Sequence, residues 1–268
     1  MVTSIVVFLL LASSLRGWPH HVPDFPGAPA LNGSSSEFAA FAANLSAYYA
    51  ALLNASRTWG TYRDHNGIHF TTATDPDGGC PWLYATAELT NCSLSSSARF
   101  IVTDLPQFQR QWDKKLVQSL PQRRIAPPHA NWSTLAVDWL EYSTGAVLSR
   151  RGYYNFGYYN FVDGGAAAAP PALVSPTASI YSSAPPPAGA SKRTVRMAGR
   201  QWKRLTASGA ASTRYEVLQL SDIDGDVPCG ATLSGQASVL SDEIQAYRSI
   251  IPVIPHDPNL ASSHGWRM

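Results

Sequence analysis

Charged residues are scarce in this chain, and the two signs nearly cancel. Only 14% of the 268 residues are Asp, Glu, Lys or Arg, and the formal net charge is +2. Proteins that bind nucleic acid carry a concentrated positive charge, so this balance argues against a nucleic-acid partner. The one N-terminal apolar run is also far shorter than the roughly 20 residues that a membrane-spanning helix needs.

Cysteine is almost absent as well. Cys80, Cys92 and Cys229 are too few for a disulfide scaffold, and the odd count leaves at least one thiol unpaired. Residues 81–90 between the first two read as one extended strand, which places its ends ~33 Å apart at ~3.3 Å per residue. We therefore expect no Cys80–Cys92 disulfide unless that strand is bent.

The usual signatures of catalytic and metal sites are missing. The sequence contains no nucleophile elbow, no phosphate-binding glycine loop and no HExxH motif. Segment 222–233 resembles a calcium loop at its first positions, but Val227 and Leu233 replace the required Gly and Glu. Asp138 and Glu141 should point to opposite faces of one strand, so they form no acid/base pair. We expect no enzymatic activity, no metal and no cofactor.

The N-terminal region indicates entry into the secretory pathway. The apolar run Ile5–Ala12 is typical of a signal-peptide core within residues 1–17, although a short N-terminal membrane anchor is the alternative. Residues 18–36 read as a leader linker. N-glycosylation sequons occur at five asparagines, more than chance supplies. These are Asn32, Asn44, Asn54, Asn91 and Asn131. The chain is therefore expected to be a secreted or luminal glycoprotein.

Hydrophobic periodicity then predicts the order of the elements. Phe38, Phe41, Leu45, Tyr48 and Leu52 form one helical stripe behind a capping box of Ser34 and Glu37. Asn66-Gly67 marks a hairpin. Strands are expected at 58–64, 68–74, 81–90, 133–143, 153–163, 178–184, 194–206 and 213–223, with short helices at 95–117 and a long closing helix at 230–251. This order favours an α+β fold with one antiparallel sheet.

Two segments are expected to be loops. Residues 164–178 and 184–192 are rich in Ala, Pro, Gly and Ser and poor in large apolar side chains, so we interpret 164–192 as a flexible insert. The tail 252–268 is expected to be disordered. In the segment 110–117, Trp112 should pack inward from a helix end while Arg110, Lys114 and Lys115 stay in water.

Five segments in order resemble the START (steroidogenic acute regulatory protein-related lipid transfer) domain family, over about residues 37 to 251. They are Thr-Trp-Gly-Thr-Tyr-Arg-Asp-His-Asn-Gly-Ile at 58–68, Gln-Phe-Gln-Arg-Gln-Trp-Asp at 107–113, Ser-Arg-Arg-Gly-Tyr at 149–153, Thr-Val-Arg at 194–196, and Thr-Arg to Asp-Gly-Asp-Val-Pro at 213–228. The chain departs from the pattern at Arg151 and Asp226, where the family has Asp and Gly.

The resemblance implies a helix-grip fold, in which a curved antiparallel sheet wraps a long C-terminal helix and leaves an apolar tunnel. One sterol, phospholipid or sphingolipid would occupy this tunnel, with transient contact to a membrane surface and a monomeric state. The candidate ligand-binding residues are Trp139, Arg150, Phe156, Tyr158, Tyr181, Met197, Tyr215, Val217, Leu233, Leu240 and Ile244. Arg150 would meet a polar head group, although a plain surface cation is the alternative.

Small residues in the first half of the closing helix suggest a gate. They are Gly230, Ser234, Gly235, Ser238 and Ser241, and the segment 230–241 would open together with the loop 149–152. Two other functions stay open. One is a secreted glycoprotein that uses the fold as a scaffold for protein contacts, and the other is a helix-grip enzyme acting on a hydrophobic substrate.

Overall fold

The computed structural model describes residues 22, 24–54, 58–74, 80–143, 150–162, 170–181, 183–191, 195–196, 198–222 and 229–254. The expected signal peptide, Met197 and the tail beyond Ile254 lie outside these residues. No helix among them is both long and apolar enough to cross a bilayer.

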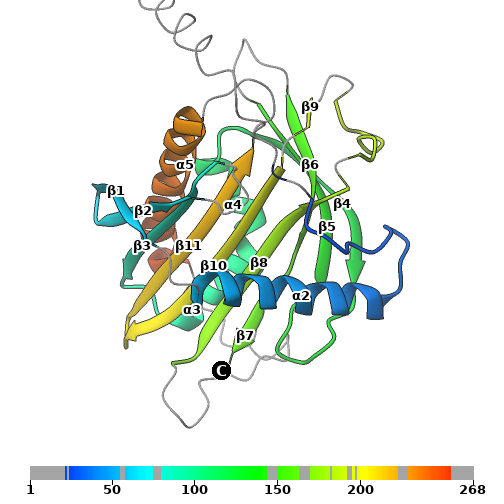
Figure 1. Ribbon diagram of the computed structural model, residues 1–268. Helices are drawn as coiled ribbons and strands as arrows, with labels where there is room; N and C mark the ends of the chain where they lie inside the picture. Colours follow the sequence, from blue (N-terminus) through cyan, green and yellow to red (C-terminus); the bar gives the residue numbers. More distant parts are fainter. Residues whose placement is uncertain are drawn as a thin grey trace, which may run out of the picture.

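One large, mostly antiparallel sheet forms the body of the molecule, and the expected α+β helix-grip architecture is confirmed (Figure 1). Its main path runs β1-β2-β3-β11-β10-β8-β6-β5-β4, with β7 paired to β8 and β9 paired in parallel to β6. The strands are β1 (Gly60–His65), β2 (Ile68–Ala73), β3 (Trp82–Thr90), β4 (Leu116–Ile125), β5 (Leu135–Tyr142), β6 (Arg151–Gly157), β7 (Asn160–Val162), β8 (Ala172–Ile180), β9 (Val195–Arg196), β10 (Ala198–Gly209) and β11 (Ser212–Asp222).

Helices cover both faces of this sheet. Helix α2 (Ser35–Asn54) crosses one face, which we call the outer face, and α5 (Cys229–Ile250) lies against the other, the inner face (Figure 1). The short helices α3 (Leu94–Arg99) and α4 (Leu105–Trp112) flank a π-helical turn at Phe100–Asp104, and a 3-10 turn at Ile251–Val253 follows α5. Two hydrophobic clusters result, one under each long helix.

The local signals in the sequence produce the elements that they predict. Ser34 N donates to Glu37 Oε2 at 2.6 Å and Glu37 N donates to Ser34 Oγ at 3.3 Å, which is the expected capping box of α2. Asn66 and Gly67 adopt φ values of 51° and 68° in the β1–β2 turn. Trp112 is buried while Lys114 and Lys115 are exposed, so the Trp112 segment has a structural role.

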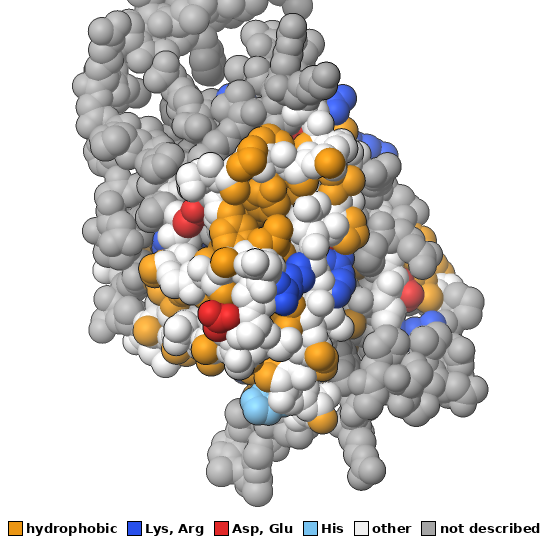
Figure 2. All heavy atoms as spheres, turned by 90° about the vertical axis from the view of Figure 1, so that its right-hand side faces the viewer, with side chains coloured by type: hydrophobic (Ala, Val, Ile, Leu, Met, Phe, Trp, Pro, Cys, Tyr) orange, Lys and Arg blue, Asp and Glu red, His pale blue; other side chains and the backbone are white. Residues whose placement is uncertain are grey.

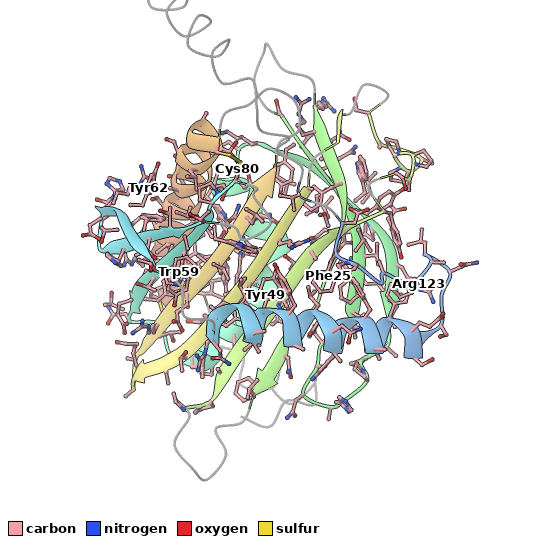
Figure 3. The ribbon with its side chains drawn as sticks, in the orientation of Figure 1. Phe25, Tyr49, Trp59, Tyr62, Cys80 and Arg123 are labelled. Carbon is pink, nitrogen blue, oxygen red and sulfur yellow. A yellow bond between two sulfur atoms is a disulfide. The ribbon has the colours of Figure 1, made fainter. Side chains whose placement is uncertain are left out.

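The leader does more than link. Val22 and Phe25 are 2% and 5% exposed within the cluster under α2. The Phe25 ring packs edge-on against Phe41, with the ring centroids 5.5 Å apart, and Phe25 N donates to Ser179 O at 3.2 Å. Figure 3 shows Phe25 between α2 and the sheet. The interpretation of 18–36 as a simple linker is therefore wrong for this segment.

The expectation of a flexible insert over 164–178 is wrong for residues 172–178, while residues 164–169 lie outside the described residues. The second half of this segment forms β8, a central strand that pairs with β10 on one side and with β6 and β7 on the other. Pro176 fits there because pairing with β7 ends at Val174 and pairing with β6 begins at Thr177. A missing N–H costs least where a strand has no neighbour on one side.

Strand β4 was not predicted from its sequence. It carries Pro121, and its register with β5 shifts between Pro121 and Arg123. It forms the edge of the sheet, where Pro, bulges and cations hinder pairing with another chain. Figure 2 shows Lys and Arg side chains together with hydrophobic ones on this side of the molecule.

Candidate ligand-binding site

Helix α5 packs closely on only part of the inner face. Over β3 and β11, the inward side chains Leu83, Tyr215 and Val217 are fully buried beneath Leu240 and Ile244. The long closing helix that the sequence predicted at 230–251 is therefore confirmed as α5. This region is solid protein and offers no room for a ligand.

Over β5, β6 and β10, the inner face is not packed in this way. Successive side chains of a strand point to opposite faces, and the residues at one set of positions, such as Trp139 and Phe156, lie in the outer cluster. The other set therefore lies on the inner face, and it includes Tyr142, Tyr153, Asn155 and Gln201. All four side chains are only half-buried. Gln219 of β11 is half-buried on the same face.

Three tyrosines in this part of the inner face are strongly desolvated. Burial raises the pKa of Tyr142 and of Tyr153 far above the usual value of a phenol, and it does the same for Tyr159 between β6 and β7. We call this part of the inner face, whose side chains are only half-buried, the inner hollow and define it by Tyr142, Tyr153, Asn155, Tyr159, Gln201 and Gln219.

An ion pair borders the inner hollow. Lys203 Nζ of β10 lies 2.7 Å from Glu243 Oε1 of α5, and Tyr215 donates to the same oxygen at 2.6 Å. Burial works to raise the pKa of Glu243, but the charge of Lys203 and its hydrogen bond together lower it below its usual value. Glu243 is thus ionised, and its Oε1 contacts both Lys203 and Tyr215.

A second acid lies at the end of α4. Asp113 is 6% exposed, and burial followed by repulsion from Glu243 raises the pKa of its carboxyl group. The charge of Asp113 also raises the pKa of Tyr142 and Tyr153, whose rings are stacked with centroids 6.4 Å apart. The wall of the hollow therefore combines aromatic surface with polar groups.

Five of the predicted ligand-binding residues lie on the α5 side. Tyr215, Val217, Leu233, Leu240 and Ile244 belong to the inner cluster, where they pack against other side chains. They lie beside the inner hollow, but most of them are packed closely against other side chains and belong to the hydrophobic core.

Four others lie on the opposite face of the sheet. Trp139, Phe156 and Tyr158 are buried in the outer cluster, and Tyr181 packs at its edge. Tyr158 donates to Ala42 O of α2 at 2.8 Å. The sheet separates these residues from Tyr215 and Val217, so the two sets do not line one cavity, contrary to the expectation. Met197 lies outside the described residues.

Arg150 has a different partner from the one expected. Its Nη1 lies 3.1 Å from Oε1 of Glu141, a fully buried carboxylate that also accepts from Gln118 Nε2 at 2.7 Å and Ser191 N at 3.1 Å. Arg150 therefore neutralises a buried acid at the β5–β6 end. Asp138 and Glu141 point to opposite faces, as predicted.

Sequence reasoning missed the residues that line the inner hollow. Tyr142, Tyr153 and Asn155 alternate along their strands with Trp139 and Phe156, and the larger apolar residues looked like the better wall. A signal was present, because amides and phenols at alternate positions mark a face that is not a dry core.

A single disulfide joins Cys80 to Cys229, across 149 residues of sequence. It ties the segment before β3 to the first residue of α5 (Figure 3). Cys92 is free and buried. The absence of a Cys80–Cys92 bond is confirmed, and the unpaired thiol expected from the odd count is Cys92.

A separate groove of about 360 Å³ lies at the other end of the sheet. The β1–β2 hairpin, β3 and β11 line it, with Asp64, His69, Glu88 and Arg214 among its residues. His69 Nδ1 lies 2.5 Å from Asp64 Oδ1. This groove is on the outer face, since Phe70, the neighbour of His69, lies in the inner cluster, and it does not communicate with the inner hollow.

The fold is similar to those of lipid-transfer domains. Human StAR-related lipid transfer protein 5 superimposes with a TM-score of 0.62 at 13% identity, covering 81% of this chain and 97% of that one. Human STARD10 gives 0.56 at 13% identity, covering 88% of each chain. A STAR-related lipid transfer protein from Xanthomonas axonopodis gives 0.53 at 15% identity, covering 72% and 98%. Neither family models nor curated protein sequences match this chain. The similarity establishes a START-like fold.

Proposed function

We propose that this protein binds one lipid in the inner hollow. The observation that carries the proposal is the part of the inner face that α5 does not pack on closely, where Tyr142, Tyr153 and Asn155 are only half-buried. It lies between the sheet and α5, where a START-like fold holds its tunnel. The similar solved structures are named for lipid transfer, which supports a lipid as the ligand.

The energetics of such binding need no catalytic group. Burying apolar lipid surface contributes about 25 cal/mol per Å², so several hundred Å² yield on the order of 10 kcal/mol before the cost of immobilising the ligand. The hollow has a polar component as well, from its phenols and amides, so it suits an amphiphile better than a pure hydrocarbon. Binding rather than catalysis is the function that we propose.

We also propose that the chain works in an oxidising compartment. The Cys80–Cys229 disulfide supports this, because such bonds persist mainly in secreted or luminal proteins. Four sequon asparagines, Asn32, Asn44, Asn54 and Asn91, are exposed, and Asn131 is half-buried. Glycan mapping of protein secreted from eukaryotic cells tests this, with occupancy expected at the four exposed sites; unmodified protein retained in the cytosol would contradict it.

Ligand entry is proposed to involve the first half of α5. An added Cβ at Gly230 or Gly235 would meet nothing within 4 Å, so the outward side of this half is open, while Leu233 and Ala237 on its other side are buried. The disulfide holds its first residue, so we propose that the rest of this half, up to residue 241, moves while Cys229 stays fixed. Part of the loop expected to move with it, Arg151 and Gly152, is strand β6. Lipid transfer would also require transient contact of a monomer with a membrane surface.

Native mass spectrometry of the purified protein, followed by lipid extraction, tests the proposal. We expect one co-purifying lipid per chain. Asn155→Trp should fill the inner hollow and lower lipid occupancy at least tenfold, whereas Thr86→Trp, in the outer groove, should leave it unchanged. An empty wild-type protein that also takes up no lipid from vesicles would contradict the proposal and favour the scaffold function.

A further inference from the structure

The side-chain amide of Gln236 on α5 is buried without a partner. Its residue is 7% exposed, and neither Oε1 nor Nε2 makes a hydrogen bond to the described residues. An unsatisfied buried donor or acceptor costs about 1–3 kcal/mol. Native proteins keep few such groups, so the position of this amide requires an explanation.

Helix geometry directs Gln236 toward the sheet. Gln236, Leu240, Glu243 and Tyr247 follow one another at spacings of four, three and four residues, which places them on one face of α5. Glu243 on this face bonds Lys203 and the β11 residue Tyr215. Gln236 therefore also looks onto the inner face, ~10 Å closer to the start of the helix.

The direction of α5 determines what lies opposite. Its start is tied to the start of β3 by the Cys80–Cys229 disulfide, and its end to the end of β3 by Arg248 Nε, which donates to Glu88 O at 2.9 Å. Strand β11 is antiparallel to β3 and so also to α5. Moving ~10 Å from Tyr215 along β11 at ~3.4 Å per residue reaches the level of Leu218 and Gln219.

The inner-face residues on either side of this level are Val217 and Gln219, and Gln219 continues a row of polar groups. Gln201 Nε2 donates to Gln219 Oε1 at 3.0 Å, and Gln219 Nε2 donates to Ser221 Oγ at 3.1 Å. Gln201 and Gln219 are half-buried, whereas the amide of Gln236 is buried. The amides on the sheet and the unpartnered amide on the helix thus belong to the facing surfaces of the sheet and α5.

We propose that Gln236 and the Gln201–Gln219 pair bind the hydroxyl group of an uncharged lipid. This inference rests on the proposed function and names the ligand class. A hydroxyl can accept from Nε2 and donate to Oε1, so it suits an amide that offers both.

The charges nearby disfavour a charged head group. Lys203 is 2.7 Å from Glu243 and Arg124 Nη1 is 2.7 Å from Asp138 Oδ1, so each of these cations already has its counter-ion. Arg151 is buried and has a partner of its own. With the cations of the described residues, burying a phosphate would need a cation taken from one of these pairs. A hydroxylated neutral lipid, a sterol or a diacylglycerol, avoids that cost.

The test compares Gln236→Leu with wild type in the full-length protein. Leu has nearly the same volume and no polar atom, so the ligand-free variant should unfold at a temperature equal to or above that of wild type. Its affinity for the hydroxylated probe should fall about tenfold, the effect of about 1.4 kcal/mol. The probes are a fluorescent 3-hydroxysterol, its 3-deoxy analogue, a fluorescent diacylglycerol and a fluorescent phosphatidylcholine.

Gln245→Leu is the matched control, because Gln245 is half-buried on another face of α5 and donates only to Asn66 O at 3.4 Å. It should leave every affinity unchanged. Binding of the deoxy analogue should be weak in wild type and insensitive to Gln236→Leu, and the tighter of the two hydroxylated probes identifies the source of the hydroxyl.

Three results would overturn the proposal. They are equal affinity of Gln236→Leu and wild type for the hydroxylated probes, a large loss of stability in the ligand-free variant, and tighter binding of phosphatidylcholine than of either hydroxylated lipid. In each of these cases, detection of a lipid bound to the protein would still support the proposed function. A wild-type protein that binds none of the probes, and takes up no lipid from mixed vesicles, overturns both.

Discussion

Lys203 and Glu243 join the sheet to its helix by a buried ion pair. Lys203 Nζ in the middle of β10 is 2.7 Å from Glu243 Oε1 in the middle of α5, and the two side chains are 13% and 8% exposed. Two charges at this depth have given up most of their hydration, so each depends on the other. The pair fixes the position of α5 over the inner face at the border of the hollow.

Removing one member of this pair should lower the free energy of unfolding far more than removing both members. Lys203→Met or Glu243→Leu alone leaves an uncompensated buried charge, with an expected loss of about 3–5 kcal/mol in the free energy of unfolding. The double variant should lose less than either single variant. Urea denaturation of the four proteins measures this as a double-mutant cycle; additive losses would show that the charges do not interact.

The same carboxylate should contribute to acid sensitivity. Interactions with Lys203 and Tyr215 outweigh burial and lower the pKa of Glu243 below its ordinary value of 4.5. Because the folded-state pKa is the lower one, its stabilisation is complete above about pH 4.5 and is lost as the pH falls through the folded-state value.

Denaturation of wild type and Glu243→Gln at pH 6, 4.5 and 3 tests this prediction. The stability gap between the two should narrow on acidification. Burial raises the pKa of Asp113 and Asp138, which gives the opposite pH dependence. Asp138 contributes equally to both proteins and cancels in the difference, whereas repulsion from Glu243 raises the pKa of Asp113 only in wild type and so offsets part of the narrowing. A gap that stays constant or widens at pH 3 would contradict the assignment.

How well the sequence predicted each part depended on whether its signal was local. Helices α2 and α5 and the β1–β2 hairpin follow from a capping box, an apolar stripe and an Asn-Gly turn, all of which act within a few residues. Strand β8 was missed because its composition resembles that of a loop. It is stable as a strand because neighbours on both sides supply hydrogen bonds that the sequence of residues 172–180 does not reveal.

The candidate site was harder for a specific reason. Alternation along β5 correctly separated Trp139 from Asp138, but it could not tell which side faces α5. In a sheet covered by one helix layer, the apolar side is the core. Here α2 and its aromatic residues bury the outer face as well, so the most apolar positions, Trp139 and Phe156, lie away from the inner hollow. The disulfide partner of Cys80 was similarly set by tertiary structure.

Loss of the Cys80–Cys229 disulfide should destabilise the protein and speed ligand exchange. The bond closes a loop of about 150 residues, for which chain entropy gives a stabilisation of about 2–5 kcal/mol. Without it the first turn of α5 is no longer tied to the segment before β3. In Cys80→Ser/Cys229→Ser, thermal unfolding should occur at lower temperature, and release of a fluorescent lipid should be several-fold faster.

A reducing agent should have the same effects on wild type and none on the double variant. Cys92→Ser serves as the control for general thiol effects, and its response to reduction should match that of wild type. Ligand release that is unchanged by reduction would show that the start of α5 does not limit exchange.

Gly235 offers a way to stabilise the first half of α5 without touching the hollow. It lies inside the helix, and an added Cβ would meet no atom within 4 Å. Gly235→Ala should therefore raise the free energy of unfolding by about 0.5–1 kcal/mol, because alanine restricts the unfolded chain and favours the helix.

Gly33→Ala is the contrasting variant, since its Cβ would come within 2.9 Å of Ala30 O and should destabilise the turn before α2. If the first half of α5 must move to admit a lipid, Gly235→Ala should also slow lipid uptake in a stopped-flow assay, whereas Gly33→Ala should not. Unchanged uptake in a stabilised Gly235→Ala protein would remove this helix from the entry route and direct attention to the ends of β5 and β6.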